Sequence, residues 1–340
     1  MNRWILRLFL SAGDVLMLTA AVRDLHRACP GQFVTDVRTP FPQLWENNPH
    51  INPLKEDDPG VELIECHYPL IHAANTIPYH FIHGFTEFLS ERVGKAVRPT
   101  AFKGDIHLSE AERGAPSRIA TLAGLDLPYW IIIAGGKYDY TIKWWNFRRY
   151  QMVVDQLHEK VLFVQVGESG HYHPRLSGVI DLRGQCSIRD LVHLVYHAEG
   201  ILCPVTFLMH LGAAVECKGN PERSRPCVVV AGGREPPQWE AYPAHQFIHT
   251  VGALPCCARG GCWRSRTVPL GDGDEKDQPN ALCRDVVGSL PRCMDMITPE
   301  EVVRRIELYF AGGQSRYLTS AQARAVRPLL TATTREILGI

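Results

Sequence analysis

The sequence predicts two α/β domains in tandem, each built around a parallel β-sheet. The chain has 340 residues, which is more than one hydrophobic core usually serves. Apolar segments of strand length alternate with segments whose apolar residues recur at helical spacing, and this order is typical of parallel sheets. Hydrophobic residues make up 45% of the chain and charged residues 21%, so there is enough apolar surface for two cores.

The first predicted domain, residues 1–127, alternates strands and helices from its start. Strands are expected over residues 4–10, 33–37 and 61–66, and helices over residues 15–29, 41–47 and 85–93. A turn over residues 11–14 joins the first strand to the first helix, which Pro30 and Gly31 end. The histidine-rich residues 67–83, which include His67, His72, His80 and His83, read as a long loop with no helical pairing of ligands.

The second predicted domain, residues 128–340, begins after a break in the pattern between residues 105 and 128. Strands are expected over residues 129–134, 161–166, 200–203 and 228–231, and helices over residues 150–158, 188–197 and 298–310 and from Thr206 onward. Thr298 caps the last helix and Pro299 occupies its first position.

Composition excludes several classes of protein. Lys plus Arg and Asp plus Glu both number 36, so no global field draws the chain to nucleic acid or anionic lipid. No apolar run is long enough to span a membrane. Arg7 and Asp14 interrupt the N-terminal apolar run, which favours a buried strand over a signal peptide. With 11 cysteines and no export signal, we expect reduced thiols and a cytoplasmic protein.

Asp14 lies between the first expected strand and the first expected helix. Open α/β sheets bind ligands at the carboxyl ends of their strands, so this carboxylate has the position of a general base. The alternative from the same position is a helix N-cap, and the two roles are compatible.

Two later segments have features of a phosphate site. Gly135 and Gly136 follow a strand and permit close backbone approach, and Lys143 supplies a positive charge nearby. Thr206 opens an uncharged helix whose free N–H groups suit a diphosphate. His210 on this helix is either a ligand contact or, more commonly for such a position, a hydrogen-bonded core histidine.

Five cysteines fall in one late segment, residues 254–295, and predict a structural metal ion. Four thiolates can enclose iron or zinc, and the polar residues around them argue against the alternative of buried free thiols. The spacing leaves open which of an adjacent pair is a ligand. The candidates are Cys256, Cys257, Cys262, Cys283 and Cys293.

The order of three short motifs resembles glycosyltransferase family 9, the ADP-heptose-dependent heptosyltransferases. These motifs are the segment from Gly13 to Arg23, the Lys143-Trp144 pair and the segment from Met209 to Ala214. The resemblance runs from about residue 4 to residue 310. It implies the GT-B fold, in which two Rossmann-like domains face each other across a cleft, with an acceptor-side first domain and a nucleotide-sugar-binding second domain.

The resemblance also implies residue roles. Asp14 becomes the catalytic base, Lys143 contacts the donor diphosphate, and the helix start from Thr206 through Met209 to His210 receives the nucleotide sugar, with Gly136 beside it. Where lipopolysaccharide-core enzymes carry Asp-Thr-Gly before the Met-His step, this chain has 205–207 Val-Thr-Phe. The carboxylate that the resemblance would assign to donor contact therefore has no counterpart at this position of the chain.

Three further segments resemble the bacterial autotransporter heptosyltransferase branch: residues 204–210, 232–236 and 254–263. That branch carries a cysteine-bound iron and assembles into large rings, which implies the same cysteines as ligands and a homo-oligomer. Its members have an additional N-terminal domain before the Gly-Asp motif, whereas here the motif begins at Gly13.

The function expected from these observations is inverting transfer of heptose from ADP-heptose to a hydroxyl of a protein Ser/Thr or a saccharide, with no metal ion on the diphosphate. Glu168 and Glu235 lie in loops after strands, where carboxylates can hold sugar hydroxyls or remain ordinary surface residues. One alternative is a transferase of the same fold that uses another nucleotide sugar. The other is a non-catalytic, metal-stabilised binding module.

Overall fold

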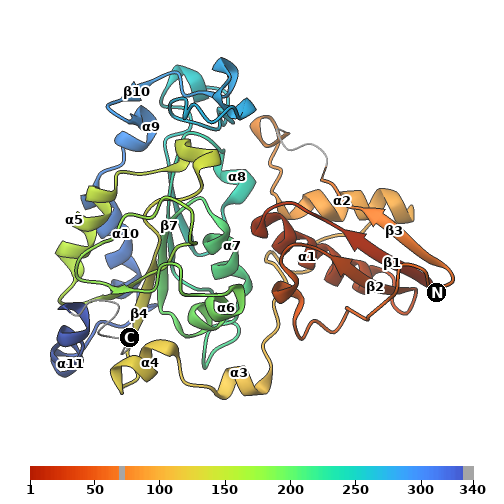
Figure 1. The fold of residues 1–340 in the computed structure, drawn as a ribbon, viewed down its shortest axis with the longest axis horizontal. Helices are drawn as coiled ribbons and strands as arrows, with labels where there is room; N and C mark the ends of the chain where they lie inside the picture. The colour runs from red at the N-terminus through yellow and green to blue at the C-terminus, as the bar shows by residue number, and fades with distance from the viewer. Residues whose placement is uncertain (69–72, 332–340) are drawn as a thin grey trace.

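A computed structural model of the protein describes residues 1–68 and 73–331. Two α/β domains lie side by side and are joined by a linker that comes down between them and runs beneath the C-terminal domain (Figure 1). The N-terminal domain has a parallel sheet in the order β2-β1-β3, and the C-terminal domain has a parallel sheet in the order β6-β5-β4-β7-β8-β9. The expected α/β class with parallel sheets is confirmed. His72 lies outside the described residues.

The N-terminal domain contains three strands and the helices that cover them. In chain order the elements are β1 (Asn2–Arg7), α1 (Ala12–Ala28), β2 (Phe33–Arg38), η1 (Pro42–Trp45), β3 (Val61–Glu65), η2 (Ala73–Asn75) and α2 (Ile82–Val93). Two short helices, α3 (Glu110–Gly114) and α4 (Arg118–Ala123), form the linker in the region where the pattern breaks.

The C-terminal domain contains the larger sheet and a segment of short turns. Its elements are β4 (Tyr129–Ile132), η3 (Tyr138–Lys143), α5 (Phe147–Leu157), β5 (Leu162–Gln165), β6 (Ile180–Asp181), α6 (Ile188–His197), β7 (Gly200–Pro204), α7 (Phe207–Ala214), β8 (Cys227–Gly232), α8 (Pro237–Glu240), β9 (His245–His249), η4 (Pro255–Cys257), η5 (Glu275–Asp277), η6 (Pro279–Ala281), β10 (Val286–Val287), β11 (Leu290–Pro291), α9 (Arg292–Asp295), α10 (Pro299–Ala311) and α11 (Ser320–Thr331).

The first helix starts earlier than the sequence pattern indicates. Ser11 and Asp14 form a capping box, in which each side chain bonds to the other residue's backbone N–H. The helix therefore begins at Ala12, and the expected turn over residues 11–14 is wrong. Asp14 is the third helical residue, so the alternative of Asp14 as the N-cap is also wrong, because Ser11 takes that position.

The expected second-domain strands are all present, but β6 and β9 complete the sheet at its two edges. An edge strand needs little apolar patterning, and β9 has the mixed sequence His-Gln-Phe-Ile-His with most residues half-buried. The cap of α10 is confirmed: the Thr298 side chain accepts a hydrogen bond from the Glu301 N–H, and Pro299 opens the helix.

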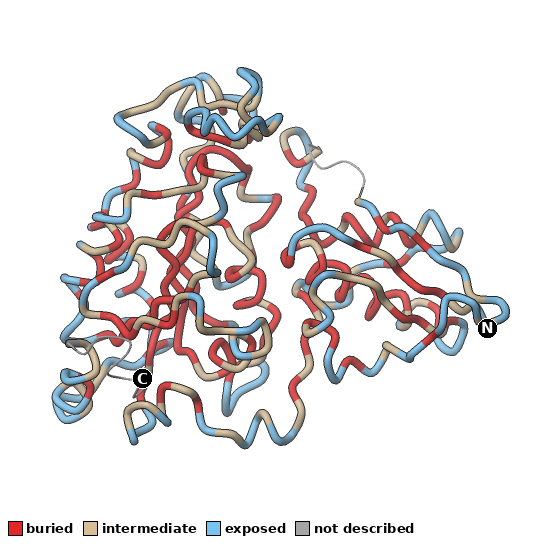
Figure 2. The backbone as a smooth tube through the Cα atoms, viewed as in Figure 1, coloured by how far each residue is buried: buried red, intermediate tan, exposed pale blue. Residues whose placement is uncertain are grey.

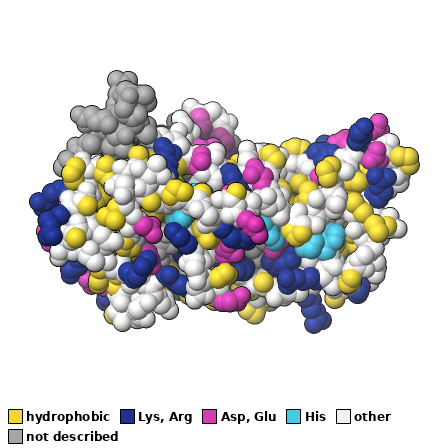
Figure 3. Space-filling model, turned by 90° about the horizontal axis from the view of Figure 1, so that it is seen from below, with side chains coloured by type: hydrophobic (Ala, Val, Ile, Leu, Met, Phe, Trp, Pro, Cys, Tyr) yellow, Lys and Arg dark blue, Asp and Glu magenta, His cyan; other side chains and the backbone are white. Residues whose placement is uncertain are grey.

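Burial follows the sheets in both domains, and the exposed residues lie on the outer helices and loops (Figure 2). The first strand is buried at Trp4, Ile5 and Leu6, as expected, but its predicted end at residue 10 is wrong: the strand ends at Arg7, and Phe9 and Leu10 are exposed. On the face shown in Figure 3, acidic side chains lie among basic ones. No helix in residues 1–68 and 73–331 combines the length and hydropathy needed to cross a membrane.

Candidate active site at the domain interface

The helices that start at the carboxyl ends of β1 and β7 pack against each other across the domain interface. A Cβ atom added at Gly13 of α1 would lie 3.5 Å from the His210 ring on α7. Farther along the interface, the Asn75 side chain donates to the Gly261 carbonyl at 3.1 Å and accepts from the Gly261 N–H at 2.9 Å. The carboxyl ends of the two sheets therefore meet at one interface.

Asp14 lies half-buried in the first turn of α1. Its Oδ2 accepts hydrogen bonds from the Ser11 hydroxyl at 2.5 Å and from the Ser11 N–H at 3.1 Å. Burial, then the Asp14 charge, raises the pKa of the nearby Tyr68 hydroxyl. Asp14 is thus held in a fixed orientation by two donors of Ser11.

Four charged residues of the C-terminal domain lie opposite, and we call them the charge network: Lys143, Arg234, Glu235 and Glu240. The Glu235 carboxylate pairs with Lys143, whose Nζ lies 2.9 Å from Oε1, and with the Arg234 guanidinium. The side chains of Lys143 and Glu235 are 20% and 4% exposed, so these charges are largely removed from water. Glu235 Oε2 and Glu240 Oε2 are buried and have no hydrogen-bond partner among the described residues.

The charge network shifts the pKa values of its own members. Burial, then the Arg234 charge, lowers the pKa of Lys143 to about 8, although Glu240, Tyr140 and Asp14 act in the opposite direction. Burial raises the pKa of Glu240 while Lys143 and Arg234 oppose that rise. The Asp14 charge acts on the pKa of both groups, so Asp14 lies near the network across the interface. Buried charged groups are costly unless they are paired, so buried cations beside unpaired carboxylate oxygens indicate a binding site for a charged, polar ligand.

Two aromatic rings hold Arg234 in place. Its guanidinium carbon lies 4.8 Å from the centre of the Tyr140 ring and 5.7 Å from that of Trp263. Its Nε donates to the Arg264 carbonyl at 2.6 Å. A cation fixed by rings and a carbonyl keeps its position whether or not a ligand is bound.

The three residues at the start of α7 that were predicted to bind the nucleotide-sugar donor differ in accessibility. Thr206 is the N-cap of α7, and its hydroxyl is buried without a hydrogen-bond partner in the described part of the chain. Met209 is fully buried in the core, and His210 is 4% exposed, with its Nδ1 2.7 Å from the Tyr242 hydroxyl. The structure therefore gives His210 the hydrogen bond expected of a core histidine, while Thr206 keeps a free hydroxyl at the helix start.

Gly136 and Glu168 lie outside the charge network. Gly136 exchanges backbone hydrogen bonds with Tyr172, and Gly135 before it has φ +123°, where an added Cβ would lie 1.9 Å from the Tyr172 carbonyl oxygen. This bridge sets the course of the loop that carries Lys143. Glu168 is 70% exposed in its side chain and lies 3.4 Å from His171, which is typical of a surface residue.

The five clustered cysteines come together in space. The charges of Cys257, Cys262 and Cys283 add to burial in raising the pKa of Cys256 to about 11. Cys262, Cys283 and Cys256 likewise contribute to the raised pKa of Cys293, after burial. In the stretches 1–68 and 73–331, however, no three His, Cys, Asp or Glu side chains are arranged to hold a metal ion, so the predicted metal site is not confirmed.

Four residues belong to the site although they were not among the predicted site residues: Tyr68, Tyr140, Arg234 and Glu240. Arg234 directly precedes the predicted Glu235 and follows the strand β8, so its position alone could have identified it. Glu240 ends a four-residue helix, and Tyr68 lies in a loop. Neither has a pattern in its neighbourhood that indicates a functional side chain.

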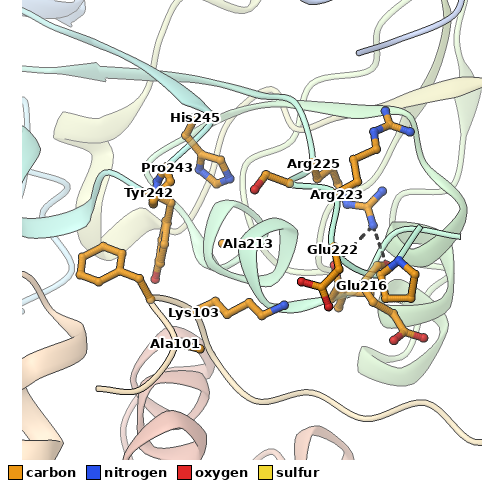
Figure 4. A pocket seen from close by; sticks show the side chains of 14 residues that line it. Ala101, Lys103, Ala213, Glu216, Glu222, Arg223, Arg225, Tyr242, Pro243 and His245 are labelled. Atoms are coloured by element: carbon orange, nitrogen blue, oxygen red, sulfur yellow. Dashed lines mark hydrogen bonds between the residues drawn. The ribbon is translucent and has the colours of Figure 1, made fainter. Parts of the chain in front are cut away.

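A cavity of about 220 Å³ lies between residues 101–103, which precede the linker, and the C-terminal end of α7. Its wall includes Lys103 and, from the C-terminal domain, Glu216, Glu222, Arg223 and His245 (Figure 4). None of the predicted site residues lines it.

The sequence matches no protein-family model and has no significant match among curated proteins. The fold is similar to the glycosyl transferase family 9 from Veillonella parvula DSM 2008, with TM-score 0.59 and 14% identity over 92% of this chain and 98% of that one. It is also similar to the ADP-heptose LPS heptosyltransferase II of E. coli, with TM-score 0.53 and 16% identity over 93% and 100%.

A third similar structure is the iron-containing dodecameric glycosyltransferase TibC from enterotoxigenic E. coli H10407. Its TM-score is 0.58 and its identity 15%, over 92% of this chain and 76% of that one. At these identities the likeness establishes the shared two-domain fold, which agrees with the expected GT-B architecture.

Proposed function

We propose that this protein is an inverting glycosyltransferase that moves heptose from ADP-heptose to an acceptor hydroxyl. The observation that carries the proposal is Asp14, fixed at the start of α1 and facing a buried network of two cations and two carboxylates. The similar structures support it, because they include proteins described as ADP-heptose heptosyltransferases and one described as a complex with ADP-D-β-D-heptose.

In this proposal Asp14 takes the proton of the acceptor hydroxyl as that oxygen attacks the anomeric carbon. Both bonds from Ser11 go to Oδ2 of Asp14. A carboxylate has about four lone-pair positions, so capacity remains for an acceptor hydroxyl. The two bonds from Ser11 also fix the carboxylate, which favours proton transfer along one direction.

The charge network and the start of α7 would then stabilise the departing ADP. Lys143 and Arg234 supply positive charge in surroundings from which water is largely excluded, where charge is worth more than in bulk solvent. Thr206 adds an unpaired hydroxyl beside the free N–H groups of the helix start. The unused oxygens of Glu235 and Glu240 suit sugar hydroxyls. Gly136 and Glu168 are further candidates for donor contacts, whereas Met209 and His210 are buried and would support the helix start.

The test is turnover of ADP-heptose by the wild type and by Asp14→Asn, with release of ADP measured by chromatography. We expect ADP release to fall at least a hundredfold in the variant while ADP binding is retained. Ser187→Ala is the matched control, because Ser187 caps α6 in the same kind of capping box, away from the site. Equal turnover by Asp14→Asn and the wild type would remove the base role.

The acceptor stays open between a protein Ser/Thr and a saccharide, and the donor between heptose and another sugar. Competing nucleotide sugars in the same assay separate the donor alternatives. A non-catalytic binding module would be stabilised by ADP-heptose and would release no ADP.

We also propose that the cysteine segment holds one structural iron or zinc ion. Clustered thiols have the donor chemistry for either ion, and Cys262, Cys283 and Cys293 with Cys256 or Cys257 make a four-ligand set. When bound, the ion would stabilise the segment and take no part in transfer. Metal analysis of the wild type and Cys283→Ser tests this, with Cys186→Ser, outside the cluster, as the control. Equal metal content in all three proteins would contradict it.

Assembly and location follow as further proposals. One similar structure is described as dodecameric, so we propose a homo-oligomer, to be tested by light scattering coupled to size exclusion. All eleven cysteines are free, which suits a reducing compartment such as the cytoplasm.

A further inference from the structure

Two histidines on α6 lie one helical turn apart and face the linker. His193 and His197 are at positions i and i+4, which share one face of a helix. Their Nε2 atoms are 3.3 Å apart, their ring centres 4.7 Å apart, and their ring planes at 79°. The two imidazoles therefore converge on one point through the same kind of nitrogen.

A third possible ligand lies beside His193 on the linker. The backbone carbonyl oxygen of Glu112, in α3, lies 3.0 Å from Nε2 of His193. Two nitrogens bound to one tetrahedral zinc ion at about 2.0–2.1 Å lie about 3.3 Å apart. The spacing between these two nitrogens is thus that of neighbouring ligands on one ion, and the carbonyl lies at a similar distance.

We infer that His193, His197 and the Glu112 carbonyl form a binding site for a divalent transition-metal ion, with Zn²⁺ as the natural candidate. The ion replaces the hydrogen bond between the two rings with two coordinate bonds. The proton that His193 Nε2 shares in the present arrangement moves to Nδ1, so both imidazoles bind in the neutral form. Solvent fills the remaining positions, which makes the site open and weaker than a four-ligand structural site.

The surroundings favour this arrangement. His197 ends α6, and the C-terminal end of a helix attracts cations. Asp126 adds a negative charge nearby, whereas Lys218 opposes the ion.

Two other histidine pairs in residues 1–68 and 73–331 lack this geometry. The His26 and His50 rings stack at 4.6 Å, and His26 Nε2 already lies 2.9 Å from the Thr35 hydroxyl. The His171 and His173 ring centres are 6.0 Å apart. The α6 pair is therefore distinguished by convergence of its nitrogens, and it joins the C-terminal domain to the linker. This inference does not depend on the proposed transferase activity.

The ion would act as a clamp between the linker and the C-terminal domain. The linker already contacts α6 through ion pairing of Glu112 with Arg189. An ion shared by α3 and α6 would hold this contact more firmly and so restrict movement of the linker against the domain.

The test is titration of the full chain with Co²⁺ after a single equivalent of Zn²⁺ has been added, which the tighter four-thiolate set takes before the open histidine site does. Calorimetry gives the stoichiometry, and absorption gives the ligand type, because thiolate-bound Co²⁺ has an intense charge-transfer band that imidazole-bound Co²⁺ lacks. We expect one equivalent bound without that band. Affinity should fall at least tenfold in His193→Gln and in His197→Gln, each checked for folding by circular dichroism.

His158→Gln is the matched control, because His158 is exposed at the end of α5 and has no histidine partner among the described residues. It should bind like the wild type. Wild-type affinity in His197→Gln, or binding with the thiolate band, would overturn the inference. So would the absence of any additional equivalent in the wild type.

Discussion

The two sides of the domain interface are built in different ways. On the N-terminal side, Asp14 is held mainly by Ser11, three residues away in the same capping box. On the C-terminal side, the charge network joins η3, the loop after β8 and α8, with Arg234 held between Tyr140 and Trp263. One side depends on local helix geometry, whereas the other depends on contacts between distant segments.

The two sides should therefore respond differently to amino-acid substitutions. A residue fixed by its own helix turn can be replaced with little effect on its neighbours. A buried network redistributes charge when one member changes, because each group shifts the pKa of the others. We expect substitutions at Asp14 to affect chemistry alone and substitutions in the network to affect binding, stability and pH dependence together.

The largest effect should come from Asp14→Asn. Loss of a general base reduces turnover by about 10²–10⁴-fold. Because Asn at this position keeps the helix and loses only part of the capping box, we expect the free energy of unfolding to fall by no more than about 1 kcal/mol. Steady-state kinetics measures the turnover, and denaturant unfolding measures the free energy of unfolding. A stability loss as large as the activity loss would show that the two sides are not built differently.

Gly135→Ala should have the next largest effect, and only on the C-terminal side. Gly135 has φ +123°, and the new Cβ would lie 1.9 Å from the Tyr172 carbonyl oxygen. The loop that carries Lys143 must shift, which we expect to cost about 2–4 kcal/mol of stability and to weaken ADP binding. Gly31→Ala is the control, since Gly31 also has a positive φ, +68°, with no atom near its added Cβ. An equal loss of ADP affinity in both variants would contradict the local effect.

Lys143→Met should weaken ADP binding by about 10–100-fold, because a charge-assisted hydrogen bond contributes roughly 1.5–3 kcal/mol. Stability should fall as well, because the buried Glu235 carboxylate loses one of its two cationic partners and keeps only Arg234. Calorimetric titration with ADP measures the affinity. The matched control is Lys137→Met, an exposed lysine in the same loop. Unchanged affinity in Lys143→Met would exclude this lysine from the binding site.

Protein stability and ADP affinity should change in opposite directions as the pH rises. The pKa of Lys143 is lowered from 10.5 to about 8, so the unfolded chain holds more protons than the folded one between these values. Stability without ligand therefore rises as pH increases from about 8 to 10.5, whereas ADP affinity falls, because binding needs the charged amine. Thermal unfolding and calorimetry over this range measure both. Lys143→Met should lose both trends, and their persistence there would assign them to another group.

Thr206→Val should have the smallest effect. The hydroxyl is buried and makes no hydrogen bond among the described residues, so its removal costs the folded protein little. If it bonds the ligand, ADP affinity falls by about 2–10-fold. Denaturant unfolding of the variant measures the stability, and calorimetric titration with ADP measures the affinity. A large stability loss with unchanged affinity would mean that the hydroxyl serves the fold.

Residues whose surroundings are local could be predicted from the sequence. The parallel α/β class, the Thr298 cap and the placement of Asp14, Lys143 and Thr206 after strands all follow from periodicity and turn residues. The pairing of Lys143 with Glu235 could not be predicted, because the two are brought together by sheet order rather than by spacing. Burial of Met209 in the core and exposure of Glu168 depend on packing in the same way.

The central claim is that the domain interface binds a nucleotide sugar through the charge network. Calorimetric titration of the wild type and Lys143→Met with ADP, ADP-heptose and a second nucleotide sugar, on protein of known metal content, tests it most directly. The expected result is selective binding of ADP and ADP-heptose by the wild type, weakened at least tenfold in the variant. Absence of binding by correctly metallated wild type, or equal binding by both proteins, would contradict the claim.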